Sequence, residues 1–118
     1  MTDLVVCLSR DEKTWPHIQK LIKDAEWKNI YIVTDEYCKQ RFTSEKKLEY
    51  VVVDFSKPVL EVINEIIQKL KNKFYDFEVA LNLVSGSGKE HMAILSALLK
   101  TGVGIRLVAV TKDGIRDL

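Results

Sequence analysis

Hydrophobic residues along this chain follow two patterns that alternate. Short, uninterrupted apolar runs bounded by polar residues are typical of parallel strands whose two faces are both buried. Segments in which apolar residues recur every three or four positions are typical of amphipathic helices. These patterns predict strands at 4–8, 29–34, 49–54, 78–84 and 105–110, and helices at 14–25, 36–42, 58–74 and 90–100.

This alternation predicts an α/β fold. Because a helix follows each strand, the strands should form a mostly parallel sheet with helices on both faces. We expect a Rossmann-like three-layer sandwich whose five-stranded sheet has the order 3-2-1-4-5. The 118 residues suit one domain, residues 1–118. In this order the first and fourth strands are neighbours where the chain connections reverse, and ligands of open α/β sheets bind beyond the carboxyl ends of such strands.

The most distinctive segment is the loop Ser85-Gly86-Ser87-Gly88-Lys89, which joins the predicted fourth strand to the helix after it. Free backbone N–H groups at a helix start attract anions, and glycine lets a ligand come close to the backbone. Lys89 adds a positive charge. The loop therefore predicts a site for a phosphate-bearing ligand, and the simpler alternative is a tight turn in which Ser85 or Ser87 caps the helix.

A second polar loop, Ser9 to Lys13, follows the first strand. The predicted strand order places it beside the glycine-rich loop, at the carboxyl ends of neighbouring strands. We therefore expect Arg10, Lys13 and Lys89 to converge on one crevice.

The glycine-rich loop does not match the common nucleotide-binding motifs. A Walker A loop needs glycine where this chain has Leu83 and serine or threonine where it has Glu90. The dinucleotide fingerprint would place its glycines after the first strand, and residues 9–12 contain none. The flanking residues do not form the serine nucleophile motif G-x-S-x-G either.

Composition narrows the range of partners. The formal net charge of +1 argues against a surface for duplex DNA. Cys7 and Cys38 lie in apolar segments without metal-ligand spacing, so we predict no metal site and no cofactor. A reducing, cytoplasmic location is the simplest interpretation of two such cysteines. No apolar run reaches the length of a membrane-spanning helix, so no membrane partner is expected.

Three features of the sequence allow two interpretations each, and a fourth, His17, allows one. His91 in the first turn of a helix is an acid–base candidate or an exposed bystander, and His17 is expected on the surface. Asn82 in a buried strand either pins the loop after it or reaches the ligand. The helix at 92–99 is apolar nearly all round, which predicts that it contacts a second copy in a homodimer, unless neighbouring segments shelter it.

The stretch from Asn82 to Met92 resembles the motif of the CARF family. In that motif an Asn or Asp in a strand is followed by Ser/Thr-Gly, another small residue, a Lys or Arg, and an apolar helix. The resemblance covers most of the chain in its order of elements, but its specific motif is this one segment, and Gly88 stands as an extra residue before Lys89.

The resemblance implies a function. CARF domains form dimers that bind cyclic oligoadenylate across the dimer axis in CRISPR-linked antiviral defence. Together with the loop itself, it implies ligand contacts from Ser9, Arg10, Asn82, Ser85, Gly86, Ser87, Gly88 and Lys89. CARF proteins usually carry an effector domain after the sensor, and 118 residues leave no room for one. We therefore expect a stand-alone protein or a part of a longer regulator.

Three functions remain open from the sequence. The first is a nucleotide-sensing domain that binds cyclic oligoadenylate as a homodimer. The second is a metal-free ring nuclease, with Ser9, Lys89 and His91 as its catalytic candidates. The third is an interaction subunit without a ligand, in which internal pairs would hold the loop cations.

Overall fold

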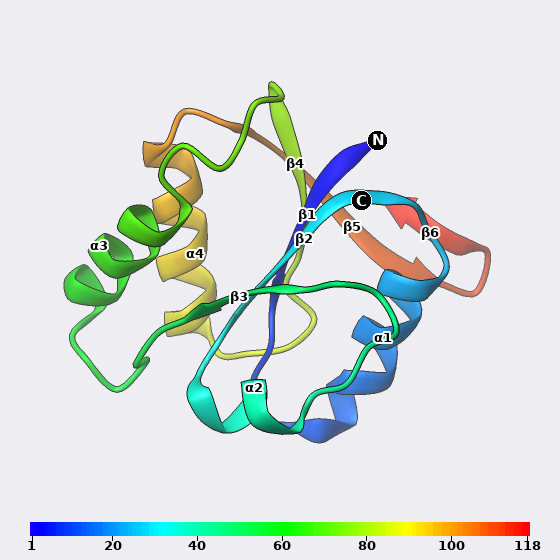
Figure 1. Cartoon of the computed structure of the whole chain (residues 1–118), viewed down its shortest axis with the longest axis horizontal. Helices are drawn as coiled ribbons and strands as arrows, with labels where there is room; N and C mark the ends of the chain where they lie inside the picture. Colours follow the sequence, from blue (N-terminus) through cyan, green and yellow to red (C-terminus); the bar gives the residue numbers. More distant parts are fainter.

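One six-stranded sheet forms the centre of the computed structural model, which describes residues 1–118 (Figure 1). Its strand order is β3-β2-β1-β4-β5-β6. The parallel strands are β1 (Thr2–Cys7), β2 (Trp27–Thr34), β3 (Glu49–Val52), β4 (Glu78–Asn82) and β5 (Gly104–Thr111). The predicted α/β class and the order of the first five strands are confirmed.

A sixth strand corrects the prediction of five. β6 (Gly114–Asp117) folds back onto β5 as an antiparallel edge strand, with Thr111 opposite Gly114. The Asp113-Gly114 pair is a frequent hairpin signal, and Gly114 has a positive φ of 96°. The strand has only four residues and one large apolar side chain, so its pattern did not distinguish it from an irregular tail.

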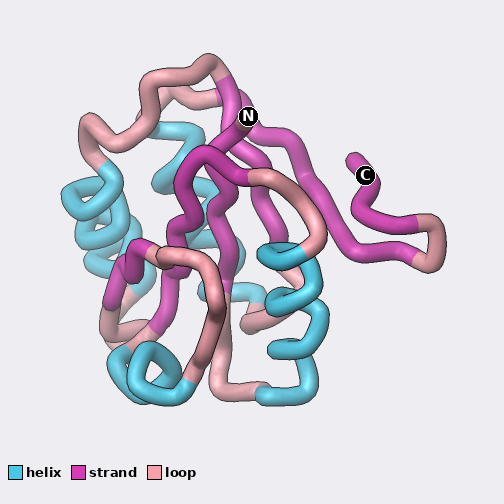
Figure 2. The backbone as a smooth tube through the Cα atoms, turned by 45° about the vertical axis from the view of Figure 1, so that its right-hand side comes forward, coloured by secondary structure: helices cyan, strands magenta, loops and turns pink.

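Helices cover both faces of the sheet (Figures 1 and 2). The short 3₁₀ helix η1 (Glu12–Thr14) leads into α1 (Trp15–Lys23), which shares one face with α2 (Glu36–Arg41), while α3 (Val59–Leu70) and α4 (Gly88–Lys100) cover the other. A hydrophobic core lies on each face of the sheet, and alternate residues of β1 pack into one or the other. Val5 packs on the α3–α4 side and Val6 on the α1–α2 side. The result is the predicted three-layer sandwich. None of the helices has both the length and the apolar character that crossing a membrane requires.

Several predicted elements, among them those that became α1, β3, β4 and α3, extended beyond their observed ends, and for β4 and α3 the structure shows the cause. β4 ends at Asn82 because the Asn82 Oδ1 atom accepts the backbone N–H of Val84 at 3.2 Å, which turns the chain out of the sheet. α3 ends at Leu70, and Asn72 then adopts a positive φ of 62°. Phe74, expected on the helix, packs instead edge-on against Tyr31, with ring centroids 5.4 Å apart.

The outer surface of α4 is less apolar than predicted. Ala93, Ile94, Ala97 and Leu98 are fully buried in the core on the α3 side of the sheet. Leu95 is half-buried against the same core, and Met92 and Leu99 are 65% and 66% exposed. Most of the helix is therefore sheltered by its own chain, and a narrow apolar stripe remains free.

Candidate functional site

The loops after β1 and β4 touch each other at the carboxyl edge of the sheet. The Oγ atom of Ser85 accepts the backbone N–H of Ser9 at 2.9 Å and lies 2.8 Å from the Ser9 Oγ atom. These loops follow neighbouring parallel strands, as the predicted order requires. The two loops therefore meet at the edge of the sheet that the sequence predicted. At their base they are joined by the direct contact between Ser9 and Ser85.

Three hydroxyl groups form a chain at this contact. The Oγ1 atom of Thr14 lies 2.7 Å from both the Asp11 carbonyl oxygen and the Ser85 Oγ atom. A carbonyl can only accept, so the single Thr14 proton goes to Asp11 and the Ser85 proton closes the contact with Thr14. Ser85 in turn accepts from Ser9. Because Ser85 is completely buried and its hydrogen bonds are internal, its side chain holds the loops together and does not face a ligand.

Asn82 is also buried and fully occupied. Its Nδ2 atom donates to the Val108 carbonyl oxygen at 2.9 Å, and its Oδ1 atom accepts from Val84. The same Nδ2 atom lies 3.1 Å from Nε2 of His17. Of the two roles that the sequence left open, the geometry gives Asn82 the structural one. The expectation for His17 was wrong: it is half-buried, because its ring reaches from α1 to β4 and β5.

Gly86 is required by both backbone and packing. Its φ of +112° lies in the region that favours glycine, and a Cβ atom there would lie 2.7 Å from Sγ of Cys7 and 3.0 Å from Nε2 of His91. Burial raises the pKa of Cys7 and raises that of Cys38 to about 11, so both thiols stay protonated at neutral pH. At Gly86 the loop thus packs directly against the uncharged thiol of Cys7.

Ser87 begins α4 as predicted for a capping serine. Its Oγ atom accepts the Glu90 backbone N–H, and the Glu90 carboxylate accepts the Ser87 backbone N–H at 3.1 Å, which completes a capping box. The next residue, Gly88, is exposed, and nothing lies within 4 Å of the position its Cβ atom would take. The front of the loop is therefore open to solvent.

Within residues 85–89, only the backbone N–H of Ser87 has an acceptor. Ser85 is buried at the base of the loop, and the N–H groups of Gly86, Gly88 and Lys89 at its front make no hydrogen bond to backbone or side chain. They lie at the start of a 13-residue helix, whose dipole places partial positive charge at the same point. Unpaired amides at such a position are suited to an anion.

The loop cations do not converge as predicted. The Nζ atom of Lys89 donates to the Lys57 carbonyl oxygen at 2.6 Å, beside α3. Arg10 points the other way, and its Nε atom donates to Asp35 at 2.8 Å. Lys13 makes no ion pair and is exposed. Lys89 and Arg10 point in opposite directions because each finds an acceptor on its own side, the Lys57 carbonyl oxygen and the Asp35 carboxylate.

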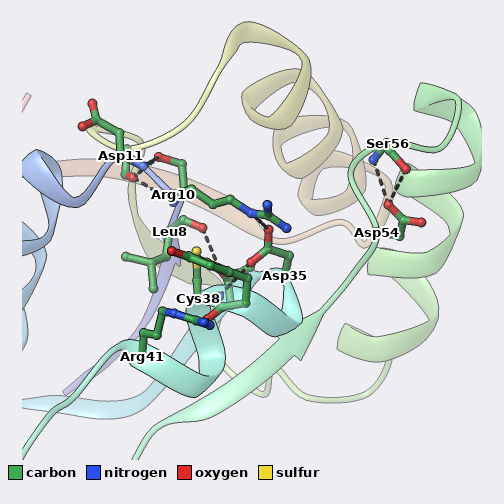
Figure 3. A network of polar contacts seen from close by, with 12 residues as sticks. Leu8, Arg10, Asp11, Asp35, Cys38, Arg41, Asp54 and Ser56 are labelled. Carbon is green, nitrogen blue, oxygen red and sulfur yellow. Dashed lines mark hydrogen bonds and ion pairs between the residues drawn. The ribbon is translucent and has the colours of Figure 1, made fainter.

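The sequence did not reveal a cluster around Tyr37. The guanidinium of Arg10 lies over the Tyr37 ring, 4.6 Å from its centroid, and that of Arg41 lies 3.6 Å from it. Figure 3 shows Arg10 reaching Asp35 at the carboxyl edge, with Arg41 on the neighbouring helix. The only local signal was the spacing of four between Tyr37 and Arg41, which puts them on one side of α2.

The catalytic candidates are not brought into a working arrangement. His91 is half-buried, and its Nε2 atom lies 2.8 Å from the Ser85 carbonyl oxygen and contacts no hydroxyl group. The Ser9 hydroxyl contacts Ser85 and the Asp11 N–H, and Lys89 contacts neither Ser9 nor His91. No nucleophile is paired with a base in the way that covalent or general-base catalysis uses.

Comparison of the sequence with models of protein families finds no match, and comparison with curated proteins finds none either. The resemblance to the CARF family therefore stays an expectation from the sequence of the segment Asn82 to Met92.

Proposed function

We propose that this chain binds a phosphate-bearing nucleotide at the carboxyl edge of its sheet. The observation that carries this proposal is the set of three unpaired amides, those of Gly86, Gly88 and Lys89, at the start of α4. The open space in front of Gly88 lets a phosphate approach them. The buried residues Asn82 and Ser85 support the loop from behind without contacting the ligand.

Lys89 joins this site by changing partner. Its Nζ atom is exposed and holds one neutral carbonyl oxygen, that of Lys57. A hydrogen bond to phosphate carries charge on both sides and is stronger than one to a carbonyl. In the proposed complex Lys89 leaves Lys57 and binds the phosphate next to the free amides.

The class of nucleotide comes from the resemblance to the CARF family. That resemblance favours cyclic oligoadenylate as the ligand and a homodimer as the binding form. Met92 and Leu99 on α4 and Leu107 on β5 are exposed apolar side chains, and they supply a surface for a second copy. Met92 lies one helical turn from Gly88, so contact through this end of α4 would bring two glycine-rich loops to one composite site.

A second candidate function is an interaction subunit that binds no nucleotide. The specific observation in its favour is that internal partners hold both principal loop cations: Asp35 holds Arg10, and the Lys57 carbonyl oxygen holds Lys89. Both contacts are exposed, and exposed pairs contribute little, so they do not prevent rearrangement. We therefore place this candidate second.

Titration calorimetry with cyclic tri-, tetra- and hexa-adenylate tests the first proposal. We expect the wild-type protein to bind one of these rings. The Lys89→Ala variant should bind it about tenfold or more weakly, because a hydrogen bond to a charged group is lost. Lys100→Ala is the matched control, since Lys100 is an exposed lysine at the other end of α4. If the wild-type protein binds none of the three rings, the second candidate replaces the first.

A further inference from the structure

Two guanidinium groups from different elements are held over one aromatic ring. Arg10 comes from the loop after β1, and Arg41 and Tyr37 come from α2. The distances from the guanidinium carbons to the Tyr37 ring centroid are 4.6 and 3.6 Å. Both distances lie within the range of a cation–π interaction, so the electron-rich ring attracts each guanidinium and helps to position it. We call the three side chains the Arg–Tyr–Arg stack.

The contacts that position the stack leave most of its donors free. Arg10 uses Nε for Asp35, and its two Nη groups have no partner. Arg41 uses Nη1 for the Tyr37 carbonyl oxygen at 2.9 Å and has no carboxylate partner. An arginine carries five N–H donors in a fixed fork that fits the oxygens of a phosphate. The stack therefore presents oriented N–H donors that have no partner. Its two arginines carry more charge than the one carboxylate of Asp35 neutralises.

Asp35 is held in place by α2 and in turn orients Arg10. Its Oδ1 atom accepts the Cys38 backbone N–H at 2.9 Å and so caps α2, while its Oδ2 atom accepts from Arg10. The Arg10 side chain is still 66% exposed. The Nε contact with Asp35 and the free Nη groups are thus compatible with an incoming anion, as the position of Arg10 in Figure 3 illustrates.

The stack lies on the same edge as the free amides. Arg10 follows Ser9, whose backbone N–H is bonded to Ser85 at the base of the glycine-rich loop. α2 follows β2 and α4 follows β4, and β1 pairs with both of these strands. Because neighbouring strands lie about 4.8 Å apart, the ends of β2 and β4 are separated by about 10 Å. A ligand with more than one phosphate can span that distance.

We propose that Arg10 and Arg41, held over Tyr37, form a second phosphate-binding element of the nucleotide site. One phosphodiester group of the ligand binds at the amides of α4, and a neighbouring one binds at the Nη groups of the stack. This inference rests on the proposed function and extends its site to residues of α2. It assigns to Arg41 and Tyr37 a role that the sequence motif does not include.

The test is titration calorimetry with the same three cyclic oligoadenylates. Arg41→Gln should lower the association constant about tenfold or more, since it removes a charged donor pair. Tyr37→Leu keeps both charges but removes the stacking surface, and it should also weaken binding, whereas Tyr37→Phe should not. Arg116→Gln is the control, because Arg116 is an exposed arginine on β6 without an ion pair. Thermal unfolding of each variant checks that the fold is intact.

The outcomes separate this inference from the proposed function. If the wild-type protein binds and Lys89→Ala weakens binding, but Arg41→Gln binds like Arg116→Gln, the second element does not exist and the first proposal stands. If Tyr37→Leu binds as tightly as wild type, the ring does not position the arginines. If the wild-type protein binds none of the rings, the proposed function fails and this inference fails with it.

Discussion

The side-chain nitrogen of Asn82 lies 3.1 Å from the Nε2 atom of His17. The orientation of the Asn82 amide is fixed, because its nitrogen also donates to the Val108 carbonyl and its oxygen accepts from Val84. The ring nitrogen must therefore accept. The backbone N–H of Val110, at 3.4 Å, donates to the same nitrogen. Two donors directed at one ring nitrogen require His17 to be neutral.

This relationship predicts a loss of stability in mild acid. Burial lowers the pKa of His17 below its ordinary value of 6.5, so the unfolded chain takes up a proton before the folded one does. The stabilising contribution is complete above pH 6.5 and declines as the pH falls toward the lowered pKa. We expect urea unfolding to give a smaller free energy of unfolding at pH 5.5 than at pH 7.5. His17→Gln, whose amide oxygen can accept without titrating, should show a smaller difference.

Asp24 and Asp54 titrate in a separate range. Hydrogen bonds from Lys20 and Ser56 lower the pKa values of Asp24 and Asp54 below 3.8, so the contributions of these carboxylates are present above that value and decline only below it. Neither carboxylate titrates between pH 7.5 and 5.5, so neither contributes to the change expected from His17. A wild-type protein whose stability does not change across this interval would contradict the assigned role of His17.

The two glycines of the loop should respond differently to alanine. Gly86→Ala places a methyl group 2.7 Å from the Cys7 sulfur at a φ of +112°, so we expect a loss of roughly 2–5 kcal/mol in the free energy of unfolding. Gly88→Ala meets open space at the start of α4 and should change stability by less than about 1 kcal/mol, in the stabilising direction. Chemical denaturation of both variants measures the contrast. Equal effects would mean that the loop is not closed over Cys7.

Local pattern was sufficient to predict most of the fold. The apolar runs 4–8 and 78–84 are typical of inner strands of a parallel sheet. The order of elements placed these two strands side by side where the chain connections reverse, as the structure confirms. What local pattern could not supply was the direction of side chains at that point. Lys89 binds the Lys57 carbonyl, 32 residues away in sequence, and Arg10 binds Asp35, 25 residues away. Such partners depend on how loops from different strands pack.

The serines illustrate the same limit. Both Ser85 and Ser87 were capping candidates, and only Ser87 caps α4. Ser85 points inward because Ser9 and Thr14 provide polar partners that lie more than 70 residues away in sequence. No spacing within the loop distinguishes a serine that caps a helix from one that joins two loops.

This difference between the serines gives a stability prediction. Ser85→Ala removes the acceptor of the Ser9 backbone N–H and breaks the hydroxyl chain in a buried place, so it should cost roughly 1–3 kcal/mol. Ser87→Ala removes an exposed cap and should cost about 1 kcal/mol. Amide hydrogen exchange should show faster exchange at Ser9 in Ser85→Ala alone. If the backbone N–H of Ser9 stays as protected from exchange as in the wild-type protein, the hydroxyl groups do not join the two loops.

The proposed homodimer predicts which apolar residues hold it together. Met92→Glu and Leu99→Glu place charges on the exposed stripe of α4, so either should convert a dimer into a folded monomer. Leu60→Glu is the matched control, because Leu60 on α3 is 67% exposed and Leu99 is 66% exposed. Leu98 is unsuitable because it is completely buried, and a charge there would unfold the chain. Light scattering after size-exclusion chromatography measures the masses. A wild-type protein that stays monomeric at high micromolar concentration, or a dimer that persists in both α4 variants, would remove this interface from the proposal.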